Sequence, residues 1–367
     1  MSGFYVGLMS GTSMDGIDAV LVSFDSAGVA IHATHSQAYP EDLKNALLTA
    51  IRQPLDVPLD QSGDLDRRVG ECFREAAQAV IDRSDVSSQD IIAIGSHGQT
   101  LRHQPNADQA FSLQIGDADI IAAGTQTTTV ANFRQADIVA GGQGAPLVPP
   151  FHQWLFHSDD ADRVVVNIGG IANITVLPAD ESDAIGFDTG PGNGLMDAWI
   201  SHHRRQPFDK NGKWAASGSV IESLLEQLLG DPYFADHPPK STGFEYFNLR
   251  WLRDFDIDSF DPVNVHTTLC ELSAVSIAKA VQDHASSARD IFVCGGGAHN
   301  SELMRRLRQN LPGATVSSTF SAGLDPDWVE AVAFAWLAMR TMNGQTGNLP
   351  SVTGAIRKVV LGDIHSP

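Results

Sequence analysis

The chain has 367 residues and a formal net charge of −20, with 24 Lys and Arg against 44 Asp and Glu. Apolar residues make up 43% and charged residues 19%, a composition that excludes a disordered or fibrous protein. At about 150 residues per domain, the length predicts two domains. The acidity argues against a protein whose main partner is nucleic acid or an anionic membrane.

Cysteine usage and the absence of targeting segments exclude further classes of protein. Cys72, Cys270 and Cys294 are odd in number and far apart, so they predict neither a disulfide framework nor a zinc knuckle. The first residues lack the basic and apolar stretches of a signal peptide. No run approaches the roughly 20 apolar residues of a membrane span. We therefore expect a cytoplasmic protein without a membrane partner.

The first half of the chain opens with strands. Apolar residues at 4–9 and 19–24 predict two strands, and the small residues of the loop 10–16 predict that they pair as a hairpin. Further predicted elements follow in chain order: a strand at 29–35, helices at 41–52 and 65–83, and a strand at 91–95.

The second half repeats this order. Residues 164–168 and 173–177 predict a hairpin around Gly169 and Gly170. The later predicted elements are a strand at 184–187, a strand at 290–294, a helix at 301–309 and a buried helix at 327–340 with Asp325 as its N-cap. The repeated order of strand, glycine loop and strand predicts a duplicated α/β architecture.

A segment rich in Gly and Pro separates the halves. Residues 141–146 predict a sharply turned or flexible stretch, and Pro149 and Pro150 precede a predicted helix through Phe156. We predict an N-terminal domain of residues 1–145 plus 340–367 and a C-terminal domain of residues 146–339.

Four loops that contain glycine follow predicted strands, at 10–16, 169–170, 188–193 and 295–297. Glycine lets the backbone approach a ligand closely, and backbone N–H groups there can bind phosphate. For any one loop, a tight turn without a ligand is the alternative. The P-loop pattern is absent, because Gly212-Lys213 is followed by Trp214. The Rossmann pattern is absent too, because the first strand leads through a loop into another strand.

A series of sequence strings resembles the anhydro-N-acetylmuramic acid kinases, a family of the actin, sugar-kinase and chaperone ATPase superfamily. In chain order the strings are VGLMSGTSMDGID at 6–18, GSHGQT at 95–100, Phe133-Arg134 with Asp137, GGQGAPLVP at 141–149, NIGGIAN at 167–173, FDTGPGN at 187–193, PPKSTG at 238–243 and DPDWVE at 325–330. The resemblance covers about residues 5–340. Two positions depart from the family pattern: Phe244 stands where Arg is expected, and Asn132 where Asp is usual.

The resemblance implies a duplicated two-domain actin-like ATPase (ribonuclease H-like) fold with an interdomain active-site cleft. It implies that water cleaves the internal bridge of 1,6-anhydro-N-acetylmuramic acid while the γ-phosphoryl group of ATP is transferred to O6. The products are N-acetylmuramic acid 6-phosphate and ADP, in peptidoglycan recycling. The resemblance also implies Mg²⁺ as a cofactor, although the sequence assigns no metal ligands, and a homodimer.

Two carboxylates are the candidate catalytic residues. Asp188 follows a predicted strand, and the chemistry needs a base that takes a proton from the water attacking C1. Its structural alternative is an Asp that caps the following turn. Glu330, in the first turn of the last predicted helix, is expected from the resemblance to help hold the sugar and the water. Its alternative is a carboxylate placed there by the helix dipole.

The resemblance assigns sugar binding to Arg134 and Asp137. His97 is a further candidate for sugar binding, because the flanking Gly95 and Gly98 suggest the edge of a cleft. The fork of an Arg side chain suits the lactyl carboxylate of the sugar, because it binds bidentately. The alternatives are a plain ion pair between Arg134 and Asp137 and a structural role for His97.

The nucleotide is assigned to three of the glycine-containing loops. The residues expected at the phosphates and the adenosine are Gly11, Thr12, Ser13, Met14, Asp15, Gly16, Ile17, Asp18, Gly169, Gly170, Gly295, Gly296 and Gly297. Two other functions stay open at this point: a sugar-sensing binding protein without turnover, and a glycosidase that uses paired carboxylates without ATP.

Overall fold

The computed structural model of the chain describes residues 3–11, 14, 16–26, 28–52, 59–105, 109–180 and 182–367. It divides into two units, one of Met1–Phe151 with Glu330–Pro367 and one of His152–Val329. The division falls within α5 (Pro149–Phe156) and at the first residue of α11 (Val329–Met342). Each unit has its own sheet, and each is described by itself below.

The sheet of the first unit begins with the predicted hairpin. Strands β1 (Phe4–Met9) and β2 (Ile17–Asp25) pair antiparallel, with Met9 opposite Asp18. The other strands of this sheet are β3 (Gly28–Gln37), β4 (Ile91–Ser96), β7 (Thr129–Ala131) and β13 (Asp363–His365), in the order β13-β7-β4-β1-β2-β3. Strand β4 runs parallel to both β1 and β7. A separate hairpin consists of β5 (Gln99–Gln104) and β6 (Phe111–Ile115).

The sheet of the second unit repeats this arrangement. Its strands are β8 (Arg163–Ile168), β9 (Ile171–Leu177), β10 (Ile185–Pro191), β11 (Asp290–Cys294) and β12 (Thr315–Ser318), in the order β10-β9-β8-β11-β12. The first three strands are antiparallel to one another, and β11 is parallel to both β8 and β12. In both units, therefore, a three-stranded meander is followed by parallel strands on the far side of its first strand. This repeat confirms the duplicated actin-like α/β fold.

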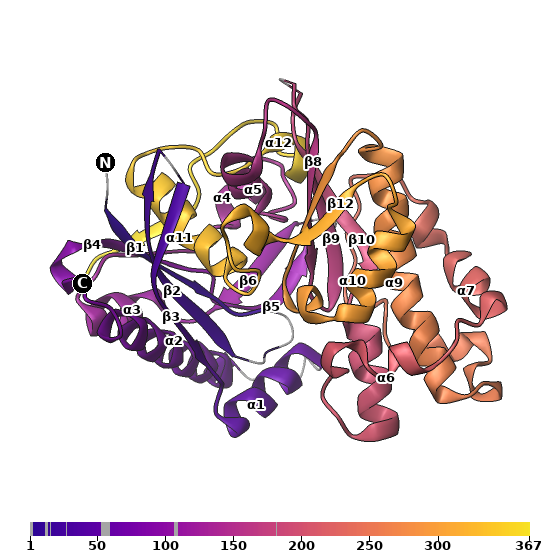
Figure 1. Ribbon diagram of the computed structural model, residues 1–367. Helices are drawn as coiled ribbons and strands as arrows, with labels where there is room; N and C mark the ends of the chain where they lie inside the picture. The colour runs from indigo at the N-terminus through magenta and orange to yellow at the C-terminus, as the bar shows by residue number, and fades with distance from the viewer. Residues whose placement is uncertain are drawn as a thin grey trace. The chain divides into compact units, whose positions relative to one another are not determined.

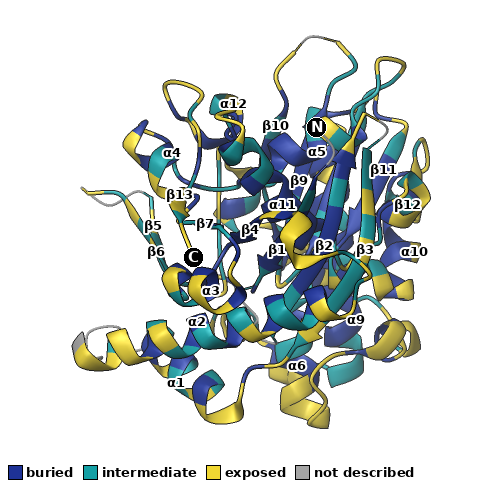
Figure 2. Ribbon diagram, turned by 90° about the vertical axis from the view of Figure 1, so that its left-hand side faces the viewer, coloured by how far each residue is buried: buried dark blue, intermediate teal, exposed yellow. Residues whose placement is uncertain are grey.

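Helix α2 (Leu59–Asp82) covers the sheet of the first unit. Its buried residues recur at helical spacing and include Leu65, Val69, Phe73 and Val80, so one face of the helix packs on the strands while the other meets solvent. Figure 2 shows the alternation of buried and exposed residues along α2. The other described α-helices of this unit are α1 (Glu41–Arg52), α3 (Ala118–Thr125), α4 (Gln135–Val139), α11 from Glu330 onward and α12 (Pro350–Thr353).

Helix α9 (Pro262–His284) packs on β9 and β10 in the second unit (Figure 1). Asp261 caps its N-terminus by accepting a hydrogen bond from the backbone N–H of Val263, and Pro262 occupies the first helical position. The other helices of this unit are α6 (Gly194–Arg204), α7 (Glu222–Leu229), α8 (Leu249–Leu252) and α10 (Ser301–Asn310). Among the described residues, no helix is long and apolar enough to cross a membrane.

Helix α11 belongs to the first unit from Glu330 onward, whereas the sequence placed residues 330–339 in the C-terminal domain. The backbone of α11 lies directly on β1 at Gly7 and on β4 at Gly95, and this contact places the helix in the first unit. The predicted boundaries after residues 145 and 339 thus differ from the divisions after Phe151 and Val329. The helix starts at Val329 rather than at residue 327, because Asp325 caps a turn instead, accepting from the N–H of Asp327 at 3.0 Å.

Candidate active site

Buried polar side chains form hydrogen bonds with the β1–β2 loop of the first unit. The hydroxyl of Ser10 lies 2.8 Å from both the carbonyl oxygen of Gly16 and Oε1 of Gln99. The amide nitrogen of Gln99 donates to the carbonyl oxygen of Gly11 at 3.4 Å. The hydroxyl of Tyr39 donates to Oε1 of Gln99 at 3.3 Å. Gln99 therefore contacts the first residues of the loop directly, and the other end of the loop, at Gly16, is linked to it through Ser10.

Two apolar side chains at the β1–β2 loop, those of Met14 and Ile17, are buried. Met14 and Ile17 are 4% and 0% exposed, and both side chains pack in the core of the first unit. Met14 adopts φ 53°, a left-handed conformation unusual for a residue with a side chain. Asp18 accepts a hydrogen bond from the hydroxyl of Ser36 at 2.7 Å. The predicted residues Thr12, Ser13 and Asp15 lie outside the described residues.

His97 and Arg134, both predicted to bind the sugar, contact each other. The Nδ1 atom of His97 lies 2.8 Å from the carbonyl oxygen of Gly98, an acceptor, so Nδ1 carries the proton. The Nε2 atom therefore accepts, and NH2 of Arg134 donates to it at 2.8 Å. NH1 of Arg134 donates to the carbonyl oxygen of Gly144 at 2.8 Å. These bonds orient the guanidinium group from two sides.

The charges of this group follow from its burial. Burial lowers the pKa of His97 to about 3, and the positive charge of Arg134 acts in the same direction. Burial also lowers the pKa of Arg134 to about 10, opposed by the negative charge of Glu330. At neutral pH the imidazole is therefore neutral and the guanidinium charged. The Nε atom of Arg134 is buried and has no hydrogen-bond partner among the described residues.

Close backbone packing fixes the position of Glu330. A Cβ atom at Gly7 of β1 would lie 1.9 Å from the carbonyl oxygen of Ala331, and one at Gly95 of β4 would lie 2.1 Å from that of Phe334. Glycine at both positions lets the backbone of α11 lie directly on the two strands. Since Glu330 precedes Ala331, the same packing holds its half-buried carboxylate near Arg134.

Asp137 has a different environment from the one the sequence suggests. Its side chain is completely buried and accepts hydrogen bonds from Gly144 N at 2.8 Å, Asn348 Nδ2 at 2.7 Å and Thr353 Oγ1 at 2.8 Å. Arg134 donates to Gly144 and His97 instead, so the alternative of a plain Arg134–Asp137 ion pair is wrong. The carboxylate of Asp137 joins the 141–146 loop to the C-terminal segment.

Asp188 of the second unit lies at an irregularity of strand β10. Asp188 pairs with Asn173 and Gly190 with Ala172, so Thr189 is an extra residue in the strand and forms a β-bulge. Strand β10 is at the edge of its sheet, and its open side is paired to the segment 240–242. Asp188 N donates to the carbonyl oxygen of Lys240 at 3.2 Å, and Thr242 N donates to Oδ2 of Asp188 at 2.9 Å.

The electrostatic surroundings of Asp188 favour its protonated form. Burial raises its pKa to about 7, and the negative charge of Glu245 adds to the effect. The hydrogen bond from Thr242 N and the positive charge of Lys240 act in the opposite direction. A carboxyl group with a pKa near 7 can take up or release a proton at physiological pH, as a general base requires.

Three of the predicted glycine loops meet within the second unit. The carbonyl oxygens of Gly169 and Gly170 accept from Asn193 N at 2.8 Å and Gly192 N at 2.9 Å. A Cβ atom at Gly192 would lie 2.4 Å from the carbonyl oxygen of Gly169, and one at Gly295 would lie 2.5 Å from Oδ1 of Asn167. Gly192 and Asn193, which directly follow β10, therefore contact loop 169–170, and Gly295 lies against the carboxyl end of β8. Residues 188–191 of the predicted loop 188–193 are part of β10.

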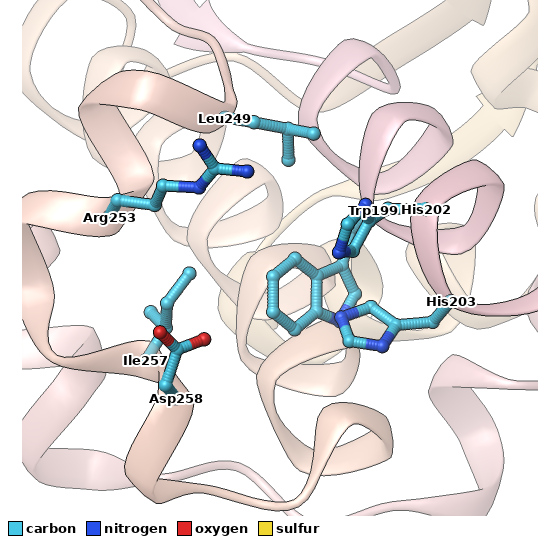
Figure 3. A pocket seen from close by; sticks show the side chains of 7 residues that line it. All are labelled: Trp199, His202, His203, Leu249, Arg253, Ile257 and Asp258. Atoms are coloured by element: carbon cyan, nitrogen blue, oxygen red, sulfur yellow. The ribbon is translucent and has the colours of Figure 1, made fainter.

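A hollow of about 290 Å³ lies elsewhere in the second unit (Figure 3). The indole of Trp199 lies at its centre, with His203 on one side and Arg253 and Asp258 on the other. None of the residues predicted from the sequence lines this hollow. Its polar side chains are exposed and come from α6 and from residues 253–258.

The structure explains one of the two departures from the family pattern, Asn132, but not the other. Asn132 has φ 56°, a conformation that Asn tolerates well, and its amide donates to Oδ2 of Asp363 at 2.7 Å. An Asp at this position would place two carboxylates together. Phe244 is 50% exposed, and nothing in the structure explains its presence.

Sequence reasoning missed the residues that support the predicted ones. Lys240 and Thr242 stand in a string that the resemblance includes, but no chemical pattern assigned them a role. Gln99 stands in another such string and is an uncharged residue whose burial only the fold reveals. No signal in the sequence connects these residues to the loops that they hold.

Comparisons with known proteins support one family. A model of the family "Anhydro-N-acetylmuramic acid kinase" matches residues 3–367. The chain is 50% identical over 367 residues to the anhydro-N-acetylmuramic acid kinase of Shewanella halifaxensis (strain HAW-EB4), covering 99% of this chain and 98% of the relative. It is 48% identical over 363 residues to that of Coxiella burnetii (strain RSA 493 / Nine Mile phase I), covering 98% and 97%.

Among solved structures, the chain is similar to the activator of the 2-hydroxyisocaproyl-CoA dehydratase from Clostridium difficile with bound ADPNP. The TM-score is 0.47 at 11% identity, with 93% of this chain and 96% of that chain covered. This likeness is too distant to bear on function.

Proposed function

Because the chain belongs to the anhydro-N-acetylmuramic acid kinase family, we propose that it opens the 1,6-anhydro ring of that sugar with water and phosphorylates O6. It is a phosphotransferase that uses ATP and gives N-acetylmuramic acid 6-phosphate and ADP. The family match over residues 3–367 carries this conclusion. The roles of individual residues below are our proposals from the local geometry.

Asp188 acts as the general base. Thr242 N occupies its Oδ2 atom, whereas Oδ1 accepts no hydrogen bond from any described residue. Oδ1 therefore takes a proton from the water that attacks C1 of the sugar. As the new C1–oxygen bond forms, the C1–O6 bond breaks, and O6 receives the γ-phosphoryl group while its bond to the β-phosphate oxygen of ATP breaks. One carboxylate thereby couples ring opening to phosphorylation.

Arg134 and Glu330 bind the sugar. The guanidinium of Arg134 is charged and oriented by His97 and Gly144, and its Nε–H has no hydrogen-bond partner within the part of the chain that the structure describes. This arrangement suits the lactyl carboxylate, because a preorganised Arg loses little freedom on binding an anion. The carboxylate of Glu330 accepts from sugar hydroxyls or from the water. His97 orients Arg134, and Asp137 contributes through the loop that carries Gly144.

The nucleotide is held mainly by backbone groups. The chain has a net charge of −20, contains only six Lys residues and has no P-loop lysine. Backbone groups of the glycine loops 11–18, 169–170 and 295–297 would hold the nucleotide, apart from the N–H groups of Gly169 and Gly295, which donate to the carbonyl oxygens of Ile171 and Pro326. Mg²⁺ would neutralise the phosphates. In the described part of the chain, no three His, Cys, Asp or Glu side chains form a metal site. Mg²⁺ bound with a nucleotide is usually held by phosphate and water oxygens with one or two carboxylates.

ADP release by the purified protein tests the proposal. With the anhydro-sugar, ATP and Mg²⁺ present, we expect ADP and the 6-phosphorylated sugar in equal amounts. D188N should lower the rate by about 10²–10⁴-fold, as for loss of a general base. D254N, an exposed Asp of the same unit, is the matched control and should keep full activity.

The two alternative functions give different results in the same experiment. A sugar-sensing protein would bind the sugar without releasing ADP, and a glycosidase would open the ring without ATP. Equal rates for D188N and wild type would contradict the assigned base. The homodimer and the cytoplasmic location stay predictions; light scattering on the purified protein tests the first.

A further inference from the structure

The backbone carbonyl of Asp188 receives a hydrogen bond from outside its own sheet. The β-bulge at Thr189 interrupts the regular pairing of β10 at this point. The hydroxyl of Tyr233, 45 residues later in the chain, donates to the carbonyl oxygen of Asp188 at 2.7 Å. An uncompensated buried carbonyl costs about 1–3 kcal/mol. The hydroxyl of Tyr233 therefore stabilises the bulged backbone that carries the candidate base.

Tyr233 is held in place by contacts that do not involve strand β10. Tyr233 is 7% exposed, and its backbone N–H donates to Oδ1 of Asp231 at 2.9 Å. Its ring packs edge-on against Phe247, with centroids 5.3 Å apart, and against Phe234 at 5.9 Å. Burial raises the pKa of the Tyr233 hydroxyl, which therefore stays protonated and acts as a donor. The donor is thus fixed in position and in protonation state.

Tyr233 also holds the segment on the other side of Asp188. The Nζ atom of Lys240 donates to the carbonyl oxygen of Tyr233 at 3.0 Å and lies 4.6 Å from the centroid of its ring. Two residues further on, Thr242 N donates to Oδ2 of Asp188. One aromatic residue therefore contacts both the backbone of Asp188 and the segment that orients its carboxylate.

We propose that Tyr233 is a positioning residue for Asp188, which keeps Oδ2 on the N–H of Thr242 and leaves Oδ1 directed at the reacting water. The catalytic part of this inference rests on the proposed function. Removing the hydroxyl frees the bulge to relax, which lengthens the bond from Thr242 and displaces the carboxylate. Displacement of a catalytic group by about 1 Å can cost 10²-fold in rate.

A matched pair of tyrosine variants provides the test. Tyr246 lies in the same aromatic cluster, 6.1 Å from Tyr233 between ring centroids, and its hydroxyl donates to Oδ1 of Asp231 at 2.8 Å. Y233F and Y246F each lose one hydroxyl and one hydrogen bond, but only Tyr233 contacts Asp188. We expect Y233F to lower kcat by about 10- to 100-fold with nearly unchanged KM values. Y246F should retain wild-type kcat, even if its Tm falls as far.

The titration of Asp188, followed by carboxyl NMR, gives a second readout that needs no activity. The charged groups facing Asp188 are Lys240 and Glu245, and neither changes in these variants. With a weaker bond from Thr242, the pKa of Asp188 should rise in Y233F and stay at its wild-type value in Y246F.

The two readouts separate the failure of each proposal. Equal kcat and an equal Asp188 pKa in Y233F, Y246F and wild type would overturn the positioning role while leaving the proposed function intact. A wild type that releases no ADP would overturn the proposed function. The NMR comparison would still decide in that case whether Tyr233 orients the carboxylate.

Discussion

The NH2 group of Arg134 donates a hydrogen bond to Nε2 of His97 at 2.8 Å. Because an Arg side chain can only donate, this contact requires a neutral imidazole with its proton on Nδ1. The histidine is therefore an acceptor that orients the guanidinium group, and a proton on Nε2 would break the contact. This excludes His97 as a proton carrier at neutral pH.

His97 should not titrate in the physiological range. Its pKa is lowered to about 3, whereas an unfolded His titrates near 6.5. In NMR spectra of the His ring protons, the His97 signal is identified by its absence in H97Q. This signal should not shift between pH 5 and 8. Below about pH 6.5 the unfolded chain binds a proton at His97 that the folded chain does not bind. The free energy of unfolding therefore decreases as pH falls below about 6.5. A midpoint near pH 6.5 for this signal would contradict the geometry.

The rate should follow the ionisation of Asp188. Its pKa is raised to about 7, and a general base must be ionised, so kcat/KM should fall as pH decreases through about 7. We expect a slope of one proton on this acid limb, measured as ADP release between pH 5 and 9. An acid limb near pH 4, typical of an exposed Asp, would contradict the assignment.

The same pKa shift makes a prediction about stability with the opposite direction to that of His97. Folded Asp188 binds its proton more tightly than the unfolded chain, whose Asp titrates near 3.9. The stability contributed by this proton is present below about pH 4 and is lost as pH rises to about 7. Wild type should therefore lose more Tm than D188N between pH 5 and 8, as measured by differential scanning calorimetry. Parallel Tm curves would contradict the shift.

Asp137 should be required for stability more than for substrate contact. In D137N, an NH2 group replaces one acceptor that faces Gly144 N, Asn348 Nδ2 or Thr353 Oγ1. We expect a loss of about 2–4 kcal/mol in the free energy of unfolding, measured with urea. D85N, an exposed Asp of the same unit, serves as the control. Normal stability with a raised KM for the sugar would instead support direct binding by Asp137.

Gly95 should not tolerate a side chain. The Cβ atom of G95A would lie 2.1 Å from the carbonyl oxygen of Phe334, so β4 and α11 must separate. We expect a loss of about 1–3 kcal/mol in the free energy of unfolding. G63A is the matched control: Gly63 is in helix α2, a Cβ there meets nothing within 4 Å, and Ala should add about 0.5–1 kcal/mol. Equal Tm values for the two variants would contradict the close packing.

Most of the fold could be predicted from short segments of the sequence. The hairpin of 4–9 with 19–24 and that of 164–168 with 173–177 appear as β1–β2 and β8–β9. The predicted helices at 41–52 and 301–309 match α1 and α10. The β5–β6 hairpin and helix α9 are present in the structure but were not predicted from the sequence. Side-chain periodicity and turn residues act between near neighbours, so such elements can be inferred locally.

The candidate site, like the fold, could be predicted from the sequence only where the relevant residues are neighbours in the chain. The sequence by itself determined that the glycine loops 169–170 and 295–297 follow strands of a duplicated α/β chain, because strand and loop are adjacent residues. Asp188, expected after a strand, lies within β10 instead. Only the tertiary structure decided what holds them: Thr242 lies 54 residues from Asp188, and Asn348 lies 211 residues from Asp137. Burial, and with it the raised pKa of Asp188 and the neutral His97, also arises only when distant segments exclude water from these groups.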